Sequence, residues 1–208
     1  MLDNYYADSY GVIHQIEVKE FNKDYASQYN SYGELSNYIS YLRYGWIVGA
    51  INRQPSSILD IGYGNGAFLK VCKQAGVQEC YGEDVSDYPV PNGCYSIKYD
   101  DIFSRNFDLV TMFDSFEHFK DLSFIENLKC TYLVISVPNC YGDKDEWFKN
   151  WKHRRENEHL HHFNTYSLRI YCESFGYQAI TVSTIEDVIR KDSNYNPNII
   201  TMCFKKKS

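Results

Sequence analysis

The sequence predicts a single α/β domain built around a mostly parallel, doubly wound sheet, and three observations support this prediction. The chain has 208 residues, which is enough for one large domain. From residue 57 onward, short β-rich runs alternate with helical stretches, as they do in βαβ units. A glycine-rich turn joins the first of these runs to a helix. Hydrophobic residues make up 44% of the chain and can fill one core.

The expected parallel strands are short runs rich in β-branched, aromatic and other apolar residues. Between the first two runs, residues 67–76 place apolar side chains at helical spacing, and Gly76 ends the predicted helix. One βαβ unit is therefore predicted. The five runs cover residues 57–61, 79–83, 95–99, 107–113 and 132–137.

The tail predicts a helix followed by a closing antiparallel pair of strands. The helix covers residues 165–175, with Thr165 as its N-cap and Gly176 as its stop. The strands cover residues 177–184 and 199–204, separated by a turn-rich segment at residues 192–198.

The N-terminal part predicts one helix and a peripheral arm. Apolar positions at near-helical spacing predict a helix over residues 35–52, packed against the sheet edge. Residues 1–34 contain many tyrosines and polar residues, with one possible strand at residues 11–18, and are expected to form an arm or a lid. The expected organisation is an arm at 1–34 and one domain at 35–208.

Composition narrows the classes of function and partner. The net charge of -6 and the pI near 5.5 make nucleic acid a poor expected partner, because phosphate binding needs a basic surface. The seven scattered cysteines never form a C-x-x-C pair and indicate reduced thiols. No leader-like start and no long apolar run are seen, so a cytoplasmic protein without a membrane anchor is expected. The sequence does not indicate an oligomeric state.

The strongest motif is a glycine-rich turn after residues 57–61. Gly62, Gly64 and Gly66 are spaced two apart, whereas the dinucleotide fingerprint has three residue steps between its second and third glycines, so NAD is disfavoured. Asp60 stands just before the turn, where its carboxylate favours a positively charged ligand. Asp84 follows the next strand, where an acid can accept hydrogen bonds from a ribose diol. The pattern predicts a cationic nucleoside ligand.

These motifs resemble the class I S-adenosylmethionine (SAM)-dependent methyltransferases. The resemblance spans about residues 35–204 and includes Asp60-Ile-Gly62-x-Gly64-x-Gly66, Gly82-Glu-Asp84-Val-Ser86 and the run Phe107-Asp108 to Phe113-Asp114-x-x-Glu117-His118. It is strongest with the ubiquinone-biosynthesis-like and sugar-modifying branch. The family implies a Rossmann-like, doubly wound, mostly parallel seven-stranded sheet with an antiparallel last strand and helices on both faces. It also implies SAM as cofactor and methyl transfer to a small-molecule acceptor, with O-methylation favoured. Tyr63 departs from the family, which often has Cys there.

The resemblance also implies a set of cofactor-binding residues. The glycine turn would lie under the methionine part, Asp84 on the ribose and Asp101-Ile102 near the adenine, with Asp100 as the alternative. Arg43 resembles an arginine that some relatives use for the cofactor carboxylate, and a surface helix arginine is the alternative. Tyr25, Tyr29 and Tyr32 either fold over the ligand or only pack. The full set is Arg43, Asp60, Gly62, Tyr63, Gly64, Asn65, Gly66, Asp84, Val85, Asp101, Ile102, Phe113 and Asp114.

Histidines are the expected catalytic residues on the acceptor side. Methyl transfer needs a group that takes the acceptor proton, and His159 or His162 is the hypothesised general base, with His118 also near the strand ends. The alternative is that these histidines only hold their loop. No metal site is expected, because the spacing His159-x-His161-His162 is not the helical i, i+4 pair of a zinc site. The alternative is that these three histidines bind a divalent metal together with Glu117, His118 and Glu158. Two other functions stay open: a SAM-binding or partner-binding module without catalysis, and a nucleic-acid methyltransferase.

Overall fold

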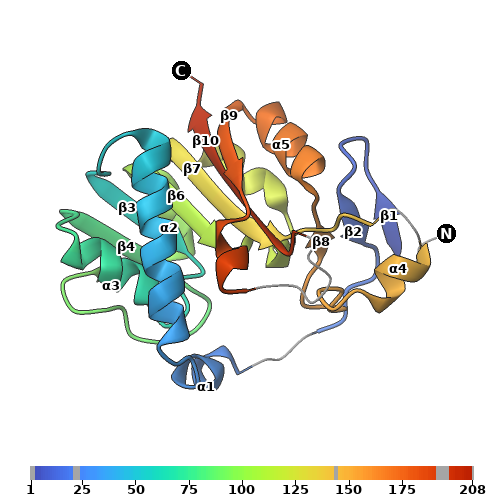
Figure 1. The fold of residues 1–208 in the computed structure, drawn as a ribbon, viewed down its shortest axis with the longest axis horizontal. Coiled ribbons are helices and arrows are strands. Elements are labelled where there is room, and N and C mark those ends of the chain that lie inside the picture. Colours follow the sequence, from blue (N-terminus) through green and yellow to red (C-terminus); the bar gives the residue numbers. More distant parts are fainter. Residues whose placement is uncertain (1–2, 21–23, 143–144, 191–196, 208) are drawn as a thin grey trace.

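The structure is a computed structural model that describes residues 3–20, 24–142, 145–190 and 197–207. Its centre is a seven-stranded sheet in the order β5-β4-β3-β6-β7-β10-β9 (Figure 1). Only β10 runs antiparallel to its neighbours β7 and β9, so the predicted fold class is confirmed. The strands are β3 (Ser57–Ile61), β4 (Glu79–Glu83), β5 (Tyr95–Ser96), β6 (Asn106–Phe113), β7 (Lys129–Pro138), β9 (Tyr177–Ser183) and β10 (Ile199–Lys206).

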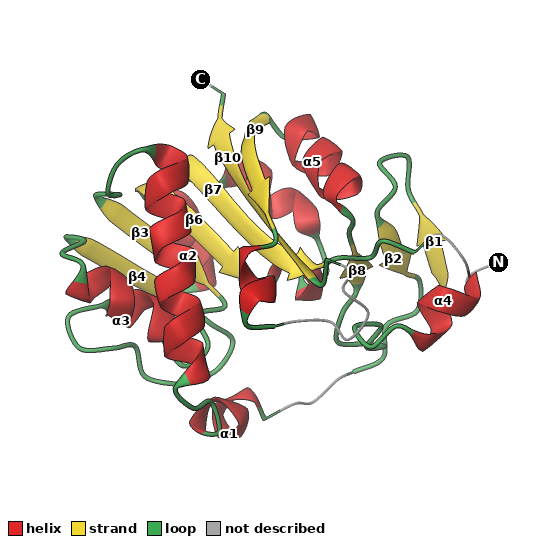
Figure 2. Ribbon diagram, in the orientation of Figure 1, coloured by secondary structure: helices red, strands yellow, loops and turns green. Residues whose placement is uncertain are grey.

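Helices cover both faces of this sheet (Figure 2). On one face, α2 (Leu35–Ile51) and α3 (Ala67–Gln74) pack against strand residues such as Ile58 and Leu109. On the other, α5 (Thr165–Ser174) and the short helices η1 (Tyr99–Ser104) and η3 (Leu122–Asn127) pack against residues such as Leu59 and Val110. Adjacent residues of one strand thus face opposite layers, as the pleat of a strand requires.

The N-terminal residues form a second, smaller sheet beside the first (Figure 1). β1 (Tyr5–Ala7) pairs with β2 (Ile13–Gln15), and β2 pairs with β8 (His161–His162). Tyr5 packs in an aromatic cluster with α4 (Asp145–Asn150), while Val12 is fully buried in the main core. The remaining helices are α1 (Tyr25–Asn30), η2 (Phe116–His118) and η4 (Ile185–Val188).

Several element boundaries differ from the sequence prediction. The N-cap of α5 is Asn164 and not Thr165, because Asn164 and Ser167 form a reciprocal capping box. The third predicted strand shortens to β5, since a 3-10 helix begins at Tyr99. The strand expected at residues 11–18 covers only β2. Most of the predicted turn at residues 192–198 lies outside the described residues.

The structure also bears on the thiols and on membrane insertion. All seven cysteines are free thiols, in agreement with the prediction. Among the described helices, none combines the length and the apolar character that crossing a bilayer would need.

The burial of Val12 predicts that the N-terminal hairpin contributes to the stability of the whole domain. Val12→Ala should lower the free energy of unfolding by about 1–3 kcal/mol, because it removes buried methyl groups from a packed core. The matched control is Val188→Ala, since Val188 is 68% exposed. Urea unfolding checks both variants, and equal midpoints for the two would contradict the assignment of Val12 to the core.

Candidate active site

Two adjoining cavities open at the carboxyl ends of β3, β4, β6 and β7, where ligands of open α/β sheets usually bind. Their volumes are about 530 Å³ and 480 Å³. The larger cavity lies between the glycine turn, α2 and the segment around residues 153–159, and the smaller one contacts the ends of β4 and β6. Five residues line both cavities: Tyr29, Gly62, Asp114, His118 and Glu158.

The glycine turn is built from close backbone contacts. Gly62 has φ 75°, and a Cβ there would lie 2.5 Å from the Cβ of Ser115. Gly66, with φ 74°, is the N-cap of α3, and Pro91 would contact a Cβ there at 2.7 Å. Both positions require glycine, for the backbone angle as well as for space. The turn therefore has a structural reason for its first and third glycines.

Two side chains within the turn, those of Tyr63 and Asn65, stabilise it. Tyr63 is buried in the core under α3, and its hydroxyl donates a hydrogen bond to the backbone oxygen of Tyr88. The amide of Asn65 donates to the hydroxyl of Ser36, and its oxygen accepts from the backbone N–H of Ala67. Asn65 thereby ties the turn to α2.

Asp84 lies at the end of β4 and is held by the glycine turn. Its carboxylate accepts hydrogen bonds from the backbone N–H of Gly64 at 2.9 Å and of Ser86 at 2.9 Å. The hydroxyl of Tyr29 in α1 donates to it at 3.3 Å, so Tyr29 lies over the turn. The neighbouring Val85 is 85% exposed and lines the smaller cavity.

Asp60 is a buried carboxyl group beneath the turn. Its side chain lines the larger cavity and accepts a hydrogen bond of 2.6 Å from Thr111. Burial raises the pKa of Asp60 to about 7, against the opposing effect of that hydrogen bond and of Arg43. A cation bound in the cavity would stabilise its charged form.

A buried ion-pair network connects α2, η4 and the end of β6. Glu186 is fully buried and pairs with Arg43 at 2.8 Å and with Arg190 at 2.7 Å, and it accepts from Ser136 at 2.7 Å. Asp114 pairs with the same arginines, at 2.9 Å and 2.7 Å. Arg43 is thus an inward-facing residue, and the surface alternative for it is wrong.

Asp114 itself has an unusual backbone. Its φ of 52° is in the left-handed region, which costs energy for a residue other than glycine. The two arginines hold it there and keep the pKa of its carboxyl group well below the usual range, against the opposing effect of desolvation. Phe113, just before it, lies under the Arg43 guanidinium at 4.1 Å and lines the larger cavity. The network thereby fixes the cavity wall at the end of β6.

Glu117, His118 and His159 converge on the larger cavity. Each offers a ligand atom, and these atoms lie within 4.8 Å of one another. Among the described residues, neither carboxylate oxygen of Glu117 has a hydrogen-bond partner, nor has Nδ1 of His159, although both side chains are buried. Such groups cost about 1–3 kcal/mol each when left unpaired. Burial raises the pKa of Glu117 well above its usual value and lowers that of His159 to about 2.

His162 is separate from this cluster. It lies in β8, only 3% exposed, with its ring packed against Tyr5, Phe148 and Trp151. It is not among the residues that line either cavity. Of the three predicted catalytic histidines, the structure brings only His118 and His159 to the cavity.

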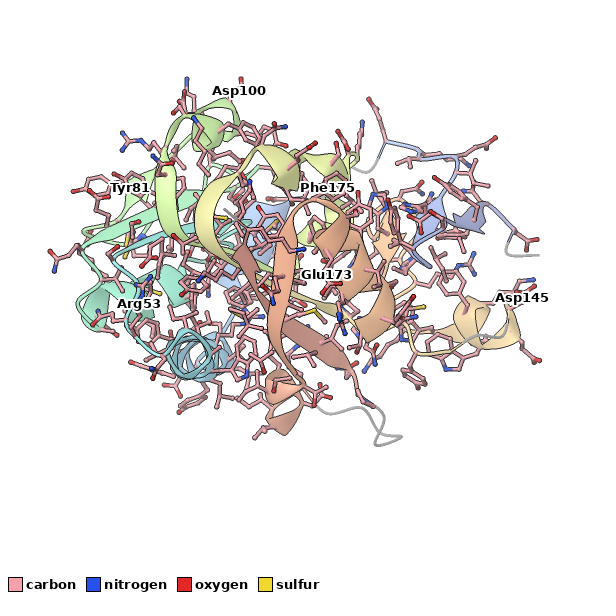
Figure 3. The ribbon with its side chains drawn as sticks, turned by 90° about the horizontal axis from the view of Figure 1, so that it is seen from above. Arg53, Tyr81, Asp100, Asp145, Glu173 and Phe175 are labelled. Carbon is pink, nitrogen blue, oxygen red and sulfur yellow. The ribbon has the colours of Figure 1, made fainter. Side chains whose placement is uncertain are left out.

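The predicted adenine contacts also lie away from both cavities. Ile102 is fully buried in the main core, and the exposed Asp101 is not among the lining residues. Figure 3 shows the alternative, Asp100, at the outer surface of the molecule. Of the other tyrosines that the sequence singled out, Tyr32 lines the larger cavity, and the side chain of Tyr25 lies outside the described residues.

Sequence reasoning missed three residues that shape this site. Glu186 and Arg190 complete the ion-pair network, and Ser115 fills the space beside Gly62. The only local sign of the network was that Glu186 and Arg190 are four residues apart, and such acid–base pairs are also common on solvent-exposed helices. Their partners are distant in the sequence, so composition and spacing could not identify them.

Comparison with known proteins shows which family the chain matches. A family model described as a methyltransferase domain matches residues 25–182, which is most of the chain. No curated protein sequence gives a significant match.

Solved structures share the fold at low sequence identity. A chain from the complex between the Haloferax volcanii Trm112 methyltransferase activator and a methyltransferase aligns with TM-score 0.62 and 11% identity, covering 91% of this chain and 100% of that one. Magnesium protoporphyrin IX methyltransferase (ChlM) from Synechocystis PCC 6803, solved with bound SAH, aligns with TM-score 0.60 and 14% identity, covering 88% and 94%. The plantazolicin methyltransferase BpumL, in complex with a substrate analogue and SAH, gives TM-score 0.56 and 14% identity, covering 88% and 90%.

The ion-pair network predicts a large loss of stability when its buried arginine is removed. Arg43→Met should lower the free energy of unfolding by about 3–5 kcal/mol, because Glu186 is then left buried with less compensation. The matched control is Arg169→Met, which breaks an i, i+4 pair with Glu173 in which the arginine side chain is 57% exposed and the acid 26%, and should cost no more than about 1 kcal/mol. Chemical unfolding measures both. If the two variants lost the same free energy of unfolding, the Arg43 network would not be a major source of stability.

Proposed function

Since the chain belongs to the class I SAM-dependent methyltransferases, we propose that it transfers the methyl group of SAM to a hydroxyl group of a small-molecule acceptor. The observation that carries the proposal is the larger cavity. One part of its wall is the glycine turn with Asp60, and another part is the cluster of Glu117, His118 and His159. A methyl donor at the first part and an acceptor at the second would lie in the same cavity.

The residues at the turn fit the chemical groups of SAM. Asp84 offers carboxylate oxygens to a ribose diol, in exchange for the hydrogen bond that Tyr29 now donates. Asp60 offers a buried carboxyl group to the positive sulfonium and ammonium groups. Arg43 and Arg190 lie beside the same cavity and suit the cofactor carboxylate. The donor set therefore complements both charges of the cofactor.

The cofactor supplies an activated methyl group, so no covalent protein nucleophile is needed. An acceptor oxygen forms a bond to the methyl carbon while the carbon–sulfur bond breaks, sulfur keeps the electron pair, and the hydroxyl proton passes to a base. The protein has to align the two reactants and keep water out. A cavity of about 530 Å³ lined by both groups of residues is suited to aligning the reactants.

The acceptor side of the proposal rests on the ionisable groups that face the cavity. His118, His159, Glu117 and Glu158 all line it, and each can contact an acceptor hydroxyl or its proton. Since the low pKa of His159 keeps it neutral, it is a hydrogen-bond acceptor that holds a proton only weakly. Glu117, whose pKa is raised, holds a proton far more readily.

Size and charge favour a small acceptor over nucleic acid. The cavity volume is in the range of small-molecule sites, and the chain carries a net charge of -6. A direct test is to incubate the chain with SAM and a panel of hydroxylated metabolites, with amine and thiol analogues alongside, and to measure S-adenosylhomocysteine. Formation with hydroxyl compounds alone supports the proposal. Binding of SAM without turnover on any acceptor would instead favour a module without catalysis.

If Asp84 binds the ribose of SAM, its substitution should weaken cofactor binding. Asp84→Asn should weaken SAM binding by about 10- to 100-fold, since hydrogen bonds to a charged group contribute about 1.5–3 kcal/mol. Titration calorimetry measures the dissociation constant. The control is Asp101→Asn, which should leave affinity unchanged because Asp101 lies away from both cavities. Loss of affinity in the control alone would restore the adenine contact that the resemblance implied.

Because the pKa of Asp60 is raised, we expect SAM binding to release a proton from its carboxyl group. Near pH 6 the carboxyl group is mostly protonated, because its pKa is raised to about 7. A bound cation lowers that pKa, so SAM affinity should rise as the pH increases through about 7. Calorimetry in two buffers of different ionisation enthalpy counts the protons. Asp60→Asn should abolish the release, whereas Glu83→Gln, another buried acid with pKa about 7, should retain it. Unchanged release in the Asn variant would contradict this role.

A further inference from the structure

The cluster of Glu117, His118 and His159 has features that its hydrogen bonding does not explain. Glu117 is 1% exposed and His159 is 5% exposed. In the described part of the chain, both oxygens of Glu117 and Nδ1 of His159 have no hydrogen-bond partner. Buried polar groups are nearly always paired, so these atoms call for a ligand that the cavity can admit.

The cluster is assembled from two distant segments. Glu117 and His118 lie in η2, directly after β6, while His159 comes from the segment before β8. The backbone N–H of Leu160 donates to the backbone oxygen of Glu117 at 2.9 Å, and this bond holds the segments together. The rings of His118 and His159 pack edge to face, with their centroids 4.8 Å apart. The fold thus fixes the three side chains against one another, while the carboxylate oxygens of Glu117 and Nδ1 of His159 have no partner among the described residues.

The donor set of two imidazoles and one carboxylate identifies the chemical class of ligand. Imidazole nitrogen favours divalent transition metals such as Zn²⁺, whereas Mg²⁺ and Ca²⁺ prefer oxygen ligands alone. Three protein ligands leave at least one coordination position open, as in catalytic zinc sites.

We propose that Glu117, His118 and His159 bind a divalent transition-metal ion whose open coordination position faces the larger cavity. The ligand atoms lie within 4.8 Å of one another. Ligands at 2.0–2.2 Å from a tetrahedral ion are about 3.5 Å apart, so binding draws the three side chains together. The spacing of residues 159–162 argued against a metal site, but only one of the three ligands comes from that segment and the other two come from η2.

This site deepens the proposed function, on which its catalytic meaning rests. A hydroxyl oxygen of the acceptor would occupy the open position, where the ion holds it in place and lowers the pKa of the hydroxyl. The three ligands then no longer take the proton. The proton then passes to another acid or base of the cavity, whose lining also includes Glu158, paired with Arg155, and His153.

The experiment measures metal binding directly on the full chain. The purified protein is stripped with a chelator and then titrated with Zn²⁺, Co²⁺ or Mg²⁺ by calorimetry, with the visible absorption of Co²⁺ as a second readout. We expect one equivalent of Zn²⁺ or Co²⁺ and much weaker Mg²⁺ binding. Glu117→Gln and His159→Gln should each weaken Zn²⁺ binding by about 100-fold or more and alter the Co²⁺ spectrum.

Two controls make the outcome decisive. His14→Gln changes a second histidine pair, in which Nδ1 of His14 lies 2.7 Å from Nδ1 of His161, and should leave Zn²⁺ binding unchanged. SAM affinity is measured on the same samples. If the wild type binds SAM but no transition metal, or if Glu117→Gln and His159→Gln bind Zn²⁺ as well as the wild type does, the metal site is refuted and the proposed function stands. If no sample binds SAM, the proposed function fails independently of the metal result.

If Glu117→Gln does not fold, His118→Gln provides the same comparison on a less buried ligand. Circular dichroism and thermal unfolding in the absence of metal establish that each variant is folded. Added Zn²⁺ should raise the unfolding temperature of the wild type and of His14→Gln, but not that of the ligand variants. Stabilisation of the ligand variants to the same extent would also overturn the proposal.

Discussion

The structure around the cavities depends on one ion-pair network. In it, Arg43 and Arg190 pair with Glu186 and Asp114. Glu186 is fully buried, so its charge is tolerable only while both arginines remain in place. The pairs connect α2, η4 and the end of β6, elements that are far apart in sequence. They also hold the strained backbone of Asp114 at the point where the strand gives way to η2. The positions of the cavity walls follow from this network.

The network separates the site into two chemically different walls. On one wall, the glycine turn, Asp60 and Asp84 provide close backbone contacts and negative charge, which suit a cationic nucleoside. On the other, Glu117 and His159 present buried atoms that no described residue satisfies. The first wall carries the residues that we propose for the cofactor. The second carries the residues that we propose for the acceptor and for a metal ion.

The sequence was sufficient for the parts of the fold that local pattern encodes. The strands around Asp60 and Asp84, the glycine turn and the helix at residues 35–51 could be predicted because hydrophobic periodicity and turn chemistry act over a few residues. The N-cap at Asn164 was misplaced by one residue, since Thr165 offers the same chemistry. The pairing of the N-terminal hairpin with β8, the role of Glu186 and the partnership of His159 with η2 could not be predicted. They depend on contacts across more than forty residues, for which a single sequence carries no signal.

The central claim is that the glycine turn and its acids form a SAM site, and thermal unfolding with added ligand tests it most directly. A ligand at about 100 times its dissociation constant adds roughly 2.7 kcal/mol of stability. For a domain of this size, that corresponds to an increase of about 5–10 °C in the unfolding temperature. The account predicts such an increase with SAM and with S-adenosylhomocysteine, and none with NAD. Stabilisation by NAD, or by none of the three ligands in a folded sample, would contradict it.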